Sequence, residues 1–107
     1  MRKAAVIVNG RFAGVLTEND SKNYEFSYNR EYVADDKAEP ISVRLPKRNE
    51  PFRSVTLFPF FFSLLSEGDN KDAQCRSLGI DKNDYFGLLL ATAYHDTIGN
   101  VTIQEIK

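Results

Sequence analysis

The chain has 107 residues, of which 42% are hydrophobic and 27% are charged, and this balance is typical of one globular domain with a modest core. Its formal net charge of −1 excludes the strongly positive surface that carries most non-specific binding to nucleic acid or to acidic membranes. The single cysteine excludes an internal disulfide and fits a reducing compartment, so we expect a cytoplasmic protein.

The N-terminal residues predict a β-hairpin followed by a third strand. Asn9 and Gly10 separate two apolar stretches, AAVIV and RFAGVL, and this dipeptide favours the positive φ angles of a type I′ turn. It also interrupts the apolar run too early for a signal peptide or a membrane-spanning segment. Tyr24, Phe26 and Tyr28 alternate with polar residues, which predicts a strand with one buried face.

A charged connection leads to a predicted fourth strand. Residues 30–40 are mostly charged and have room for one helical turn. Ile41, Val43 and Leu45 then alternate with polar residues, as in a strand that buries one side. Pro46 lacks a backbone N–H, so we expect this strand to end there.

The stretch LFPFFFSLLSEG contains half of the eight phenylalanines and predicts an amphipathic helix. Phe58, Phe61, Phe62 and Leu65 follow the spacing of one helical stripe. Pro59 fits only in the first turn, because it has no N–H to donate further along a helix. Such a cluster of rings lies either at the centre of the fold or at the centre of a contact with another molecule.

Aspartates and glycines predict where two further helices begin and end. Asp69 and Asp72 can cap a helix that ends at Gly79. Asp84 repeats the capping pattern before a third, largely apolar helix over residues 85–94.

The last residues, 99–106, alternate enough to predict a closing strand that returns to the sheet. The order of elements predicts an α+β fold in which a small antiparallel sheet packs against about three helices. That sheet consists of the N-terminal hairpin, further strands and the returning C-terminal strand. No linker divides the chain, so we expect a single domain over residues 1–107.

Residue types that support catalysis or metal binding are present but not arranged for either. Cys75, His95 and Asp96 could in principle form a thiol protease site, yet most chains of this length contain such a trio, and Cys75 is better explained as a small packing residue. The acidic stretches DNKD and DKND lack the spacing of a calcium loop. We therefore expect no catalytic residue, no metal and no cofactor.

Positive charge is concentrated between the predicted fourth strand and the aromatic helix, at Arg44, Lys47, Arg48 and Arg53. Arginine beside an aromatic ring can neutralise phosphate and stack on bases, which is one interpretation. A patch that pairs with an acidic protein partner is the interpretation we prefer, and we expect no direct contact with nucleic acid.

Four stretches, in this order and spacing, resemble the N-terminal subdomain of HipA-type serine/threonine kinases, the toxins of bacterial toxin–antitoxin systems. They are SVRLPKR at 42–48, PFFFSLLSEG at 59–68, LGIDKNDYFGLLL at 78–90 and YHDTIGNV at 94–101. The resemblance covers about residues 10–106.

The chain departs from the family pattern at three positions, because Ser66 replaces a proline, Tyr94 a glycine and Asn100 an alanine. It also ends where the kinase proper would begin, so the resemblance implies a freestanding, non-catalytic lobe.

The resemblance implies a HipS-like antitoxin of the three-gene HipBST type, which neutralises a HipA/HipT-like kinase toxin that lacks this subdomain. A HipB-like DNA-binding protein could join the complex through the kinase. Two alternatives stay open: a scaffold or activating subunit that completes the kinase fold, and a nucleic-acid-binding module.

In a full-length kinase, one surface of this subdomain faces the rest of the chain, and in a separate protein the same surface would face a partner. Aromatic anchors with an arginine rim are the usual composition of such contacts. The predicted partner-binding residues are Phe58, Phe60, Phe61, Leu64, Arg48 and Arg53.

Overall fold

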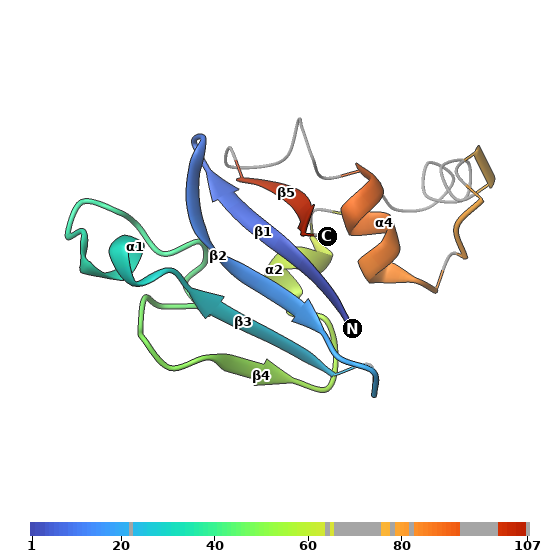
Figure 1. The fold of residues 1–107 in the computed structure, drawn as a ribbon, viewed down its shortest axis with the longest axis horizontal. Coiled ribbons are helices and arrows are strands. Elements are labelled where there is room, and N and C mark those ends of the chain that lie inside the picture. Colours follow the sequence, from blue (N-terminus) through green and yellow to red (C-terminus); the bar gives the residue numbers. More distant parts are fainter. Residues whose placement is uncertain are drawn as a thin grey trace.

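The computed structural model describes residues 1–21, 23–63, 65, 76–77, 79–81, 83–92 and 101–106. Among these described residues, five antiparallel strands form one sheet in the order β4-β3-β2-β1-β5, and three helices with described bounds accompany it (Figure 1). The strands are β1 (Arg2–Val8), β2 (Arg11–Glu18), β3 (Tyr24–Tyr28), β4 (Phe52–Ser54) and β5 (Val101–Ile106). The helices are α1 (Arg30–Ala34), α2 (Pro59–Phe62) and α4 (Tyr85–Thr92). The predicted α+β fold class is confirmed.

The N-terminal hairpin has the turn that the sequence predicts. Asn9 and Gly10 have φ angles of 53° and 80°, both positive as a type I′ turn requires. The register between β1 and β2 shifts by one residue near the turn, so that Ala13 has no direct partner on β1. The Ala13 carbonyl instead accepts a hydrogen bond from the Asn29 amide at 2.7 Å, which ties the hairpin to the start of α1.

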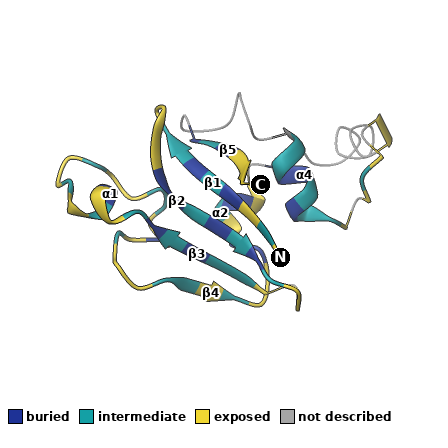
Figure 2. Cartoon of the chain, viewed as in Figure 1, coloured by how far each residue is buried: buried dark blue, intermediate teal, exposed yellow. Residues whose placement is uncertain are grey.

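One face of the sheet carries the core. Ala4, Leu16, Phe26 and Phe52 lie opposite one another on four neighbouring strands, and the first three of these are fully buried. Helices α2 and α4 cover this face, and their side chains join the same buried cluster. Figure 2 shows buried residues within the strands and exposed ones at the hairpin tip and in the loops. The closing strand β5 returns to the sheet, as the sequence predicts, and there it pairs antiparallel with β1.

The predicted strand over residues 41–45 is wrong. Val43 is 95% exposed whereas Leu45 is buried, so the two do not share a buried face. The Leu45 amide donates to the Ser42 carbonyl at 3.0 Å, which makes this stretch a tight turn. Pro40 and Pro46 flank the turn and supply no N–H for a sheet ladder. The fourth strand is β4, where Phe52 pairs with Phe26.

The aromatic helix is shorter than its apolar stripe. Pro59 occupies the first turn, as predicted, and α2 ends at Phe62. Phe62 is 41% exposed, so the predicted stripe is buried only in part. The Gly68 stop and most of the helix predicted between Asp69 and Gly79 lie outside the described residues.

An ionic cluster attaches α4 to the sheet. Arg2 on β1 donates to the buried Glu18 carboxylate from Nε at 3.0 Å and to Asp84 Oδ1 from Nη2 at 2.7 Å. Asp84 also caps α4, because its Oδ1 accepts from the Gly87 amide at 3.1 Å. Tyr24 donates its hydroxyl to Glu18 at 3.0 Å. The hydrogen bond to Asp84 is the main cause that raises the pKa of Arg2.

Replacing Asp84 with alanine removes both the cap and one of the carboxylates that bind Arg2. We expect the free energy of unfolding to fall by about 1–2 kcal/mol, the loss typical of an N-cap. Urea denaturation measures this change. Asp36→Ala is the matched control, because Asp36 is exposed in the loop after α1 and should leave stability almost unchanged. Equal losses in the two variants would contradict this assignment.

The raised pKa values of two tyrosines lead us to expect a loss of stability at alkaline pH. Burial raises the pKa of both Tyr24 and Tyr28 to about 12, and the hydrogen bond to Glu18 adds to the effect at Tyr24. Between about pH 10 and pH 12 the folded state keeps protons that the unfolded state has lost, so this contribution is complete below about pH 10 and disappears as the pH rises towards 12. In a pH titration, we expect the tyrosinate absorbance of Tyr24 and Tyr28 to appear only as the pH rises towards 12. The circular dichroism signal of the folded protein should be lost over the same pH range. Early ionisation of all five tyrosines with an intact fold would refute this expectation.

Candidate partner-binding site

The structure divides the predicted site residues between core and surface. Phe61 is fully buried, with its ring 5.6 Å from Phe26, 5.3 Å from Phe60 and 6.2 Å from Phe58, centroid to centroid. Phe61 therefore cannot meet a partner, because its whole ring is covered by the domain itself. Phe58 is also buried, with 8% of its surface exposed. Leu64 lies outside the described residues.

The remaining candidates come together at one pocket. Arg48, Arg53 and Phe60 line a hollow of about 220 Å³, and the mostly buried Phe58 also lines it. Its other lining residues are Arg44, Leu45, Phe52 and Pro59. We call this hollow the arginine pocket. It is formed by the loop before β4, by β4 itself and by the start of α2.

Tyr28 fixes the loop that forms one side of the arginine pocket. Its buried hydroxyl donates to the Leu45 carbonyl and accepts from the Ile41 amide at 3.0 Å. The ring packs edge-on against Phe26, with 4.8 Å between centroids. A core side chain therefore determines where the turn at 41–45 lies, and with it the position of Arg44.

Arg48 is held in place before any partner arrives. Its guanidinium lies over the ring of Phe52, 3.7 Å from the centroid. Nε donates to the Glu50 carbonyl at 3.1 Å, and Nη2 donates to the Pro51 carbonyl at 3.0 Å. Stacking and backbone hydrogen bonds lower the entropy that this side chain would lose on binding. Within the described part of the chain, the other N–H groups of its guanidinium have no hydrogen-bond partner and can bind an anion.

Arg53 and Arg44 are more open. Arg53 Nε forms an ion pair with Glu25 Oε1 at 3.0 Å, yet the side chain of Arg53 is 78% exposed. The side chain of Arg44 is exposed, and within the described part of the chain no carboxylate pairs with it. The pocket therefore has a positively charged rim, formed by Arg44, Arg48 and Arg53, and an apolar base, formed by its other lining residues.

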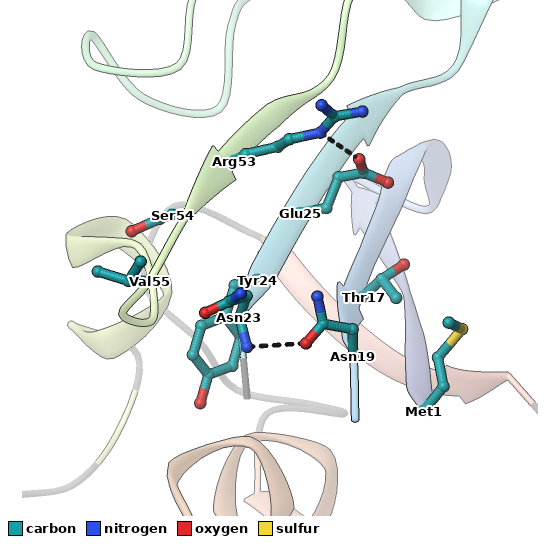
Figure 3. A pocket seen from close by; sticks show the side chains of 9 residues that line it. All are labelled: Met1, Thr17, Asn19, Asn23, Tyr24, Glu25, Arg53, Ser54 and Val55. Atoms are coloured by element: carbon teal, nitrogen blue, oxygen red, sulfur yellow. Dashed lines mark hydrogen bonds and ion pairs between the residues drawn. The ribbon is translucent and has the colours of Figure 1, made fainter. Parts of the chain in front are cut away.

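Arg53 also borders a second hollow, of about 470 Å³, at the end of the sheet where β2, β3 and β4 meet (Figure 3). There Arg53 reaches across to Glu25, and the Asn19 side chain accepts from the Asn23 amide at 2.9 Å. Arg53 is thus paired with Glu25 and Asn19 with Asn23 inside the hollow, so these groups offer a weaker case for a ligand than those of the arginine pocket.

No reactive centre emerges from the residues that the structure places. Among them, no group of three or more histidine, cysteine, aspartate or glutamate side chains could hold a metal ion. Cys75, His95 and Asp96 fall outside the described ranges, so the expectation that they form no catalytic site stays a prediction. None of the described helices has the length and apolar character needed to span a membrane.

Sequence reasoning missed Phe52 as the aromatic platform of the site. It placed the fourth strand at 41–45, which left Phe52 in a connecting segment. The available signal was the position of Phe52 between Pro51 and Arg53, directly after a turn-rich stretch. Arg44 was recognised as part of the charge cluster but not as a site residue.

The fold and the pocket together define a small α+β domain whose candidate site consists of arginines and aromatic rings. The HipA N-terminal domain family matches residues 4–104. The chain therefore belongs to the HipA N-terminal domain family. The matched unit is the N-terminal domain of HipA and not its kinase catalytic domain.

Individual relatives agree with this assignment. An uncharacterized protein of Haemophilus influenzae (strain ATCC 51907 / DSM 11121 / KW20 / Rd) is 38% identical over 107 residues, covering 100% of this chain and 95% of that protein. “Putative kinase Y4mE” of Sinorhizobium fredii (strain NBRC 101917 / NGR234) is 33% identical over 81 residues, covering 76% of this chain and only 19% of that protein. A solved structure of the N-terminal domain of HipA toxin is 30% identical with a TM-score of 0.72, covering 100% of this chain and 94% of that one.

Replacing Tyr28 with phenylalanine tests how the pocket is held. The Leu45 carbonyl and the Ile41 amide would lose their partner, so we expect a loss of about 1–3 kcal/mol in the free energy of unfolding. The NMR amide signals of Arg44 and Leu45 should also move.

Tyr32→Phe is the matched control for this experiment. The Tyr32 hydroxyl donates to the Glu39 carbonyl at 2.6 Å, and neither residue lines the arginine pocket. We expect a smaller loss of stability and unchanged signals at Arg44 and Leu45. If the two variants gave the same losses and the same shifts, Tyr28 would have no special role in the pocket.

Proposed function

We propose that this chain is a non-catalytic antitoxin that binds a HipA/HipT-like serine/threonine kinase toxin in the cytoplasm and suppresses its activity. The observation that carries the proposal is a pocket lined by arginines and by the half-buried rings of Phe52 and Phe60, on a domain of the HipA N-terminal family. Four of the six predicted partner-binding residues line this pocket: Arg48, Arg53, Phe58 and Phe60.

The lengths of the relatives support a domain that binds the kinase as a separate protein. The match with the protein named as a kinase spans 19% of that protein, so there the domain is a small part of a much longer chain. The Haemophilus protein matches over 95% of its length, so there a similar domain makes up nearly the whole protein. A contact made within one chain in the first arrangement would be made between chains in the second.

The chemistry of the pocket suits a protein contact. Arginine and aromatic residues dominate interface hot spots, because they bury large area and form several directed hydrogen bonds. Phe60 is half-buried and rests against the core ring of Phe61, so it is held rigidly at the surface. Arg48 is likewise held in place on Phe52. A HipB-like DNA-binding protein would join such a complex through the kinase.

Co-expression with a HipA-type kinase that lacks its own N-terminal domain tests the proposal. We expect the two proteins to co-purify, growth to recover and phosphorylation by the kinase to fall. A scaffold subunit that completes the kinase fold would instead raise phosphorylation. Absence of a complex together with unrelieved toxicity would rule out the antitoxin function.

Phe60→Ala is expected to weaken this complex at least about tenfold, because truncating a hot-spot aromatic typically costs about 2 kcal/mol of binding energy. Phe62→Ala is the matched control on the same helix. The ring of Phe62 packs against that of Tyr85, with 5.1 Å between centroids, and Phe62 is not among the residues that line the pocket. Titration by isothermal calorimetry measures both. Equal effects of the two variants would place the contact elsewhere on the domain.

A further inference from the structure

The charge at the rim of the arginine pocket favours binding of a negatively charged group. Arg44, Arg48 and Arg53 line it, and among the described residues that line the pocket none is acidic. Glu25 pairs with Arg53, but it approaches from β3 and is not among the residues that line this pocket. Because most guanidinium donors of Arg44 and Arg48 are unused within the described part of the chain, carboxylates can pair with them without breaking existing ion pairs.

The base of the pocket favours binding of an apolar group as well. Five of its lining residues are apolar: Leu45, Phe52, Phe58, Pro59 and Phe60. A bare phosphate ion would leave this apolar surface uncovered. The volume of about 220 Å³ is below the roughly 300–1,000 Å³ of sites that enclose drug-sized ligands, so it suits a single large side chain better than a small molecule.

A nucleic-acid strand fits this surface less well. Its binding needs a row of cations that follows several phosphates, and strong affinity grows with their number. Here the three arginines of the rim line a single pocket, Arg53 is already paired with Glu25, and the chain has a formal net charge of −1. The observations therefore favour a protein segment.

We propose that the arginine pocket recognises an acidic segment of the partner kinase that inserts one large apolar side chain between Phe52 and Phe60 and places flanking carboxylates on Arg44 and Arg48. This inference rests on the proposed function for the identity of the partner, but the chemistry of the segment follows from the pocket alone. The apolar side chain supplies burial, and the carboxylates fix its register.

Binding of short synthetic peptides to the full chain tests the chemistry directly. The probe is a capped peptide with one phenylalanine flanked on both sides by glutamates. One control peptide carries glutamines in place of the glutamates, and another carries alanine in place of the phenylalanine. We expect weak binding of the probe, with NMR shifts at Arg44, Arg48 and Phe60, and markedly weaker binding of both controls. Failure of the probe to bind, or equal binding of all three, would overturn the proposal.

Other anions separate the remaining explanations. Inorganic phosphate is expected to give no comparable shifts, and a thymidine oligonucleotide is expected to bind more weakly than the probe. If phosphate displaced the probe completely at similar concentration, the pocket would be a simple anion site. If the oligonucleotide bound more tightly, the site would belong to nucleic-acid recognition. Either result would overturn the proposal.

Arg44→Gln provides the variant test, because this side chain is exposed and its loss should not disturb folding. We expect about fivefold weaker binding of the probe, as for the loss of one exposed ion pair. Arg30→Gln is the matched control, since it removes an equally exposed arginine from α1, away from the pocket. Equal affinities of the two variants would count against the assigned contact.

A competition experiment with the kinase separates this inference from the proposed function. If the kinase binds the chain but the probe neither binds nor competes, the acidic-segment inference fails and the proposed function stands. If the probe binds with the expected selectivity but no HipA-type kinase does, the proposed function fails and the chemistry of the pocket stands. If the probe peptide and the kinase compete for the chain, the result supports both the acidic-segment inference and the proposed function.

Discussion

The contact between Phe61 and Phe26 is the interaction on which the rest of this structure depends. Phe26 lies on β3, between Leu16 and Phe52 on the sheet face that carries the core, and Phe61 is the buried residue of the short helix α2. A four-residue helix has almost no stability of its own, so its position comes from this packing. Once Phe61 is buried, Phe60 is placed at the surface beside it, where it lines the arginine pocket.

The same core organises the charged side of the pocket. Tyr28 belongs to the buried aromatic cluster through its ring and to the loop at 41–45 through its hydroxyl. The loop lacks a regular ladder of backbone hydrogen bonds, so this hydroxyl satisfies groups that would otherwise lose theirs on burial. Phe52 then acts in two places, since it pairs with Phe26 across the strands and supports the guanidinium of Arg48. Stability and recognition thus share side chains here, and a change at the pocket base acts on both.

The elements set by neighbouring residues could be predicted from the sequence. Asn9 and Gly10 specify the hairpin turn because few other residues adopt two successive positive φ angles. Tyr24, Phe26 and Tyr28 specify a one-sided strand by alternation alone. The cap at Asp84 also follows from local chemistry, whereas its ion pair with Arg2 joins residues 82 positions apart and has no signature in the sequence.

Residues 41–45 show where alternation misleads. Their apolar spacing is that of a strand, yet two flanking prolines and the hydroxyl of Tyr28 make them a turn with Val43 in solvent. Likewise, the sequence identified an arginine-rich stretch next to an aromatic cluster, but it could not tell Phe61 in the core from Phe60 at the surface. By itself the sequence determined the local elements and the residue types available for a contact. Only the tertiary structure decided which of them share a pocket, because that depends on packing between segments far apart in the chain.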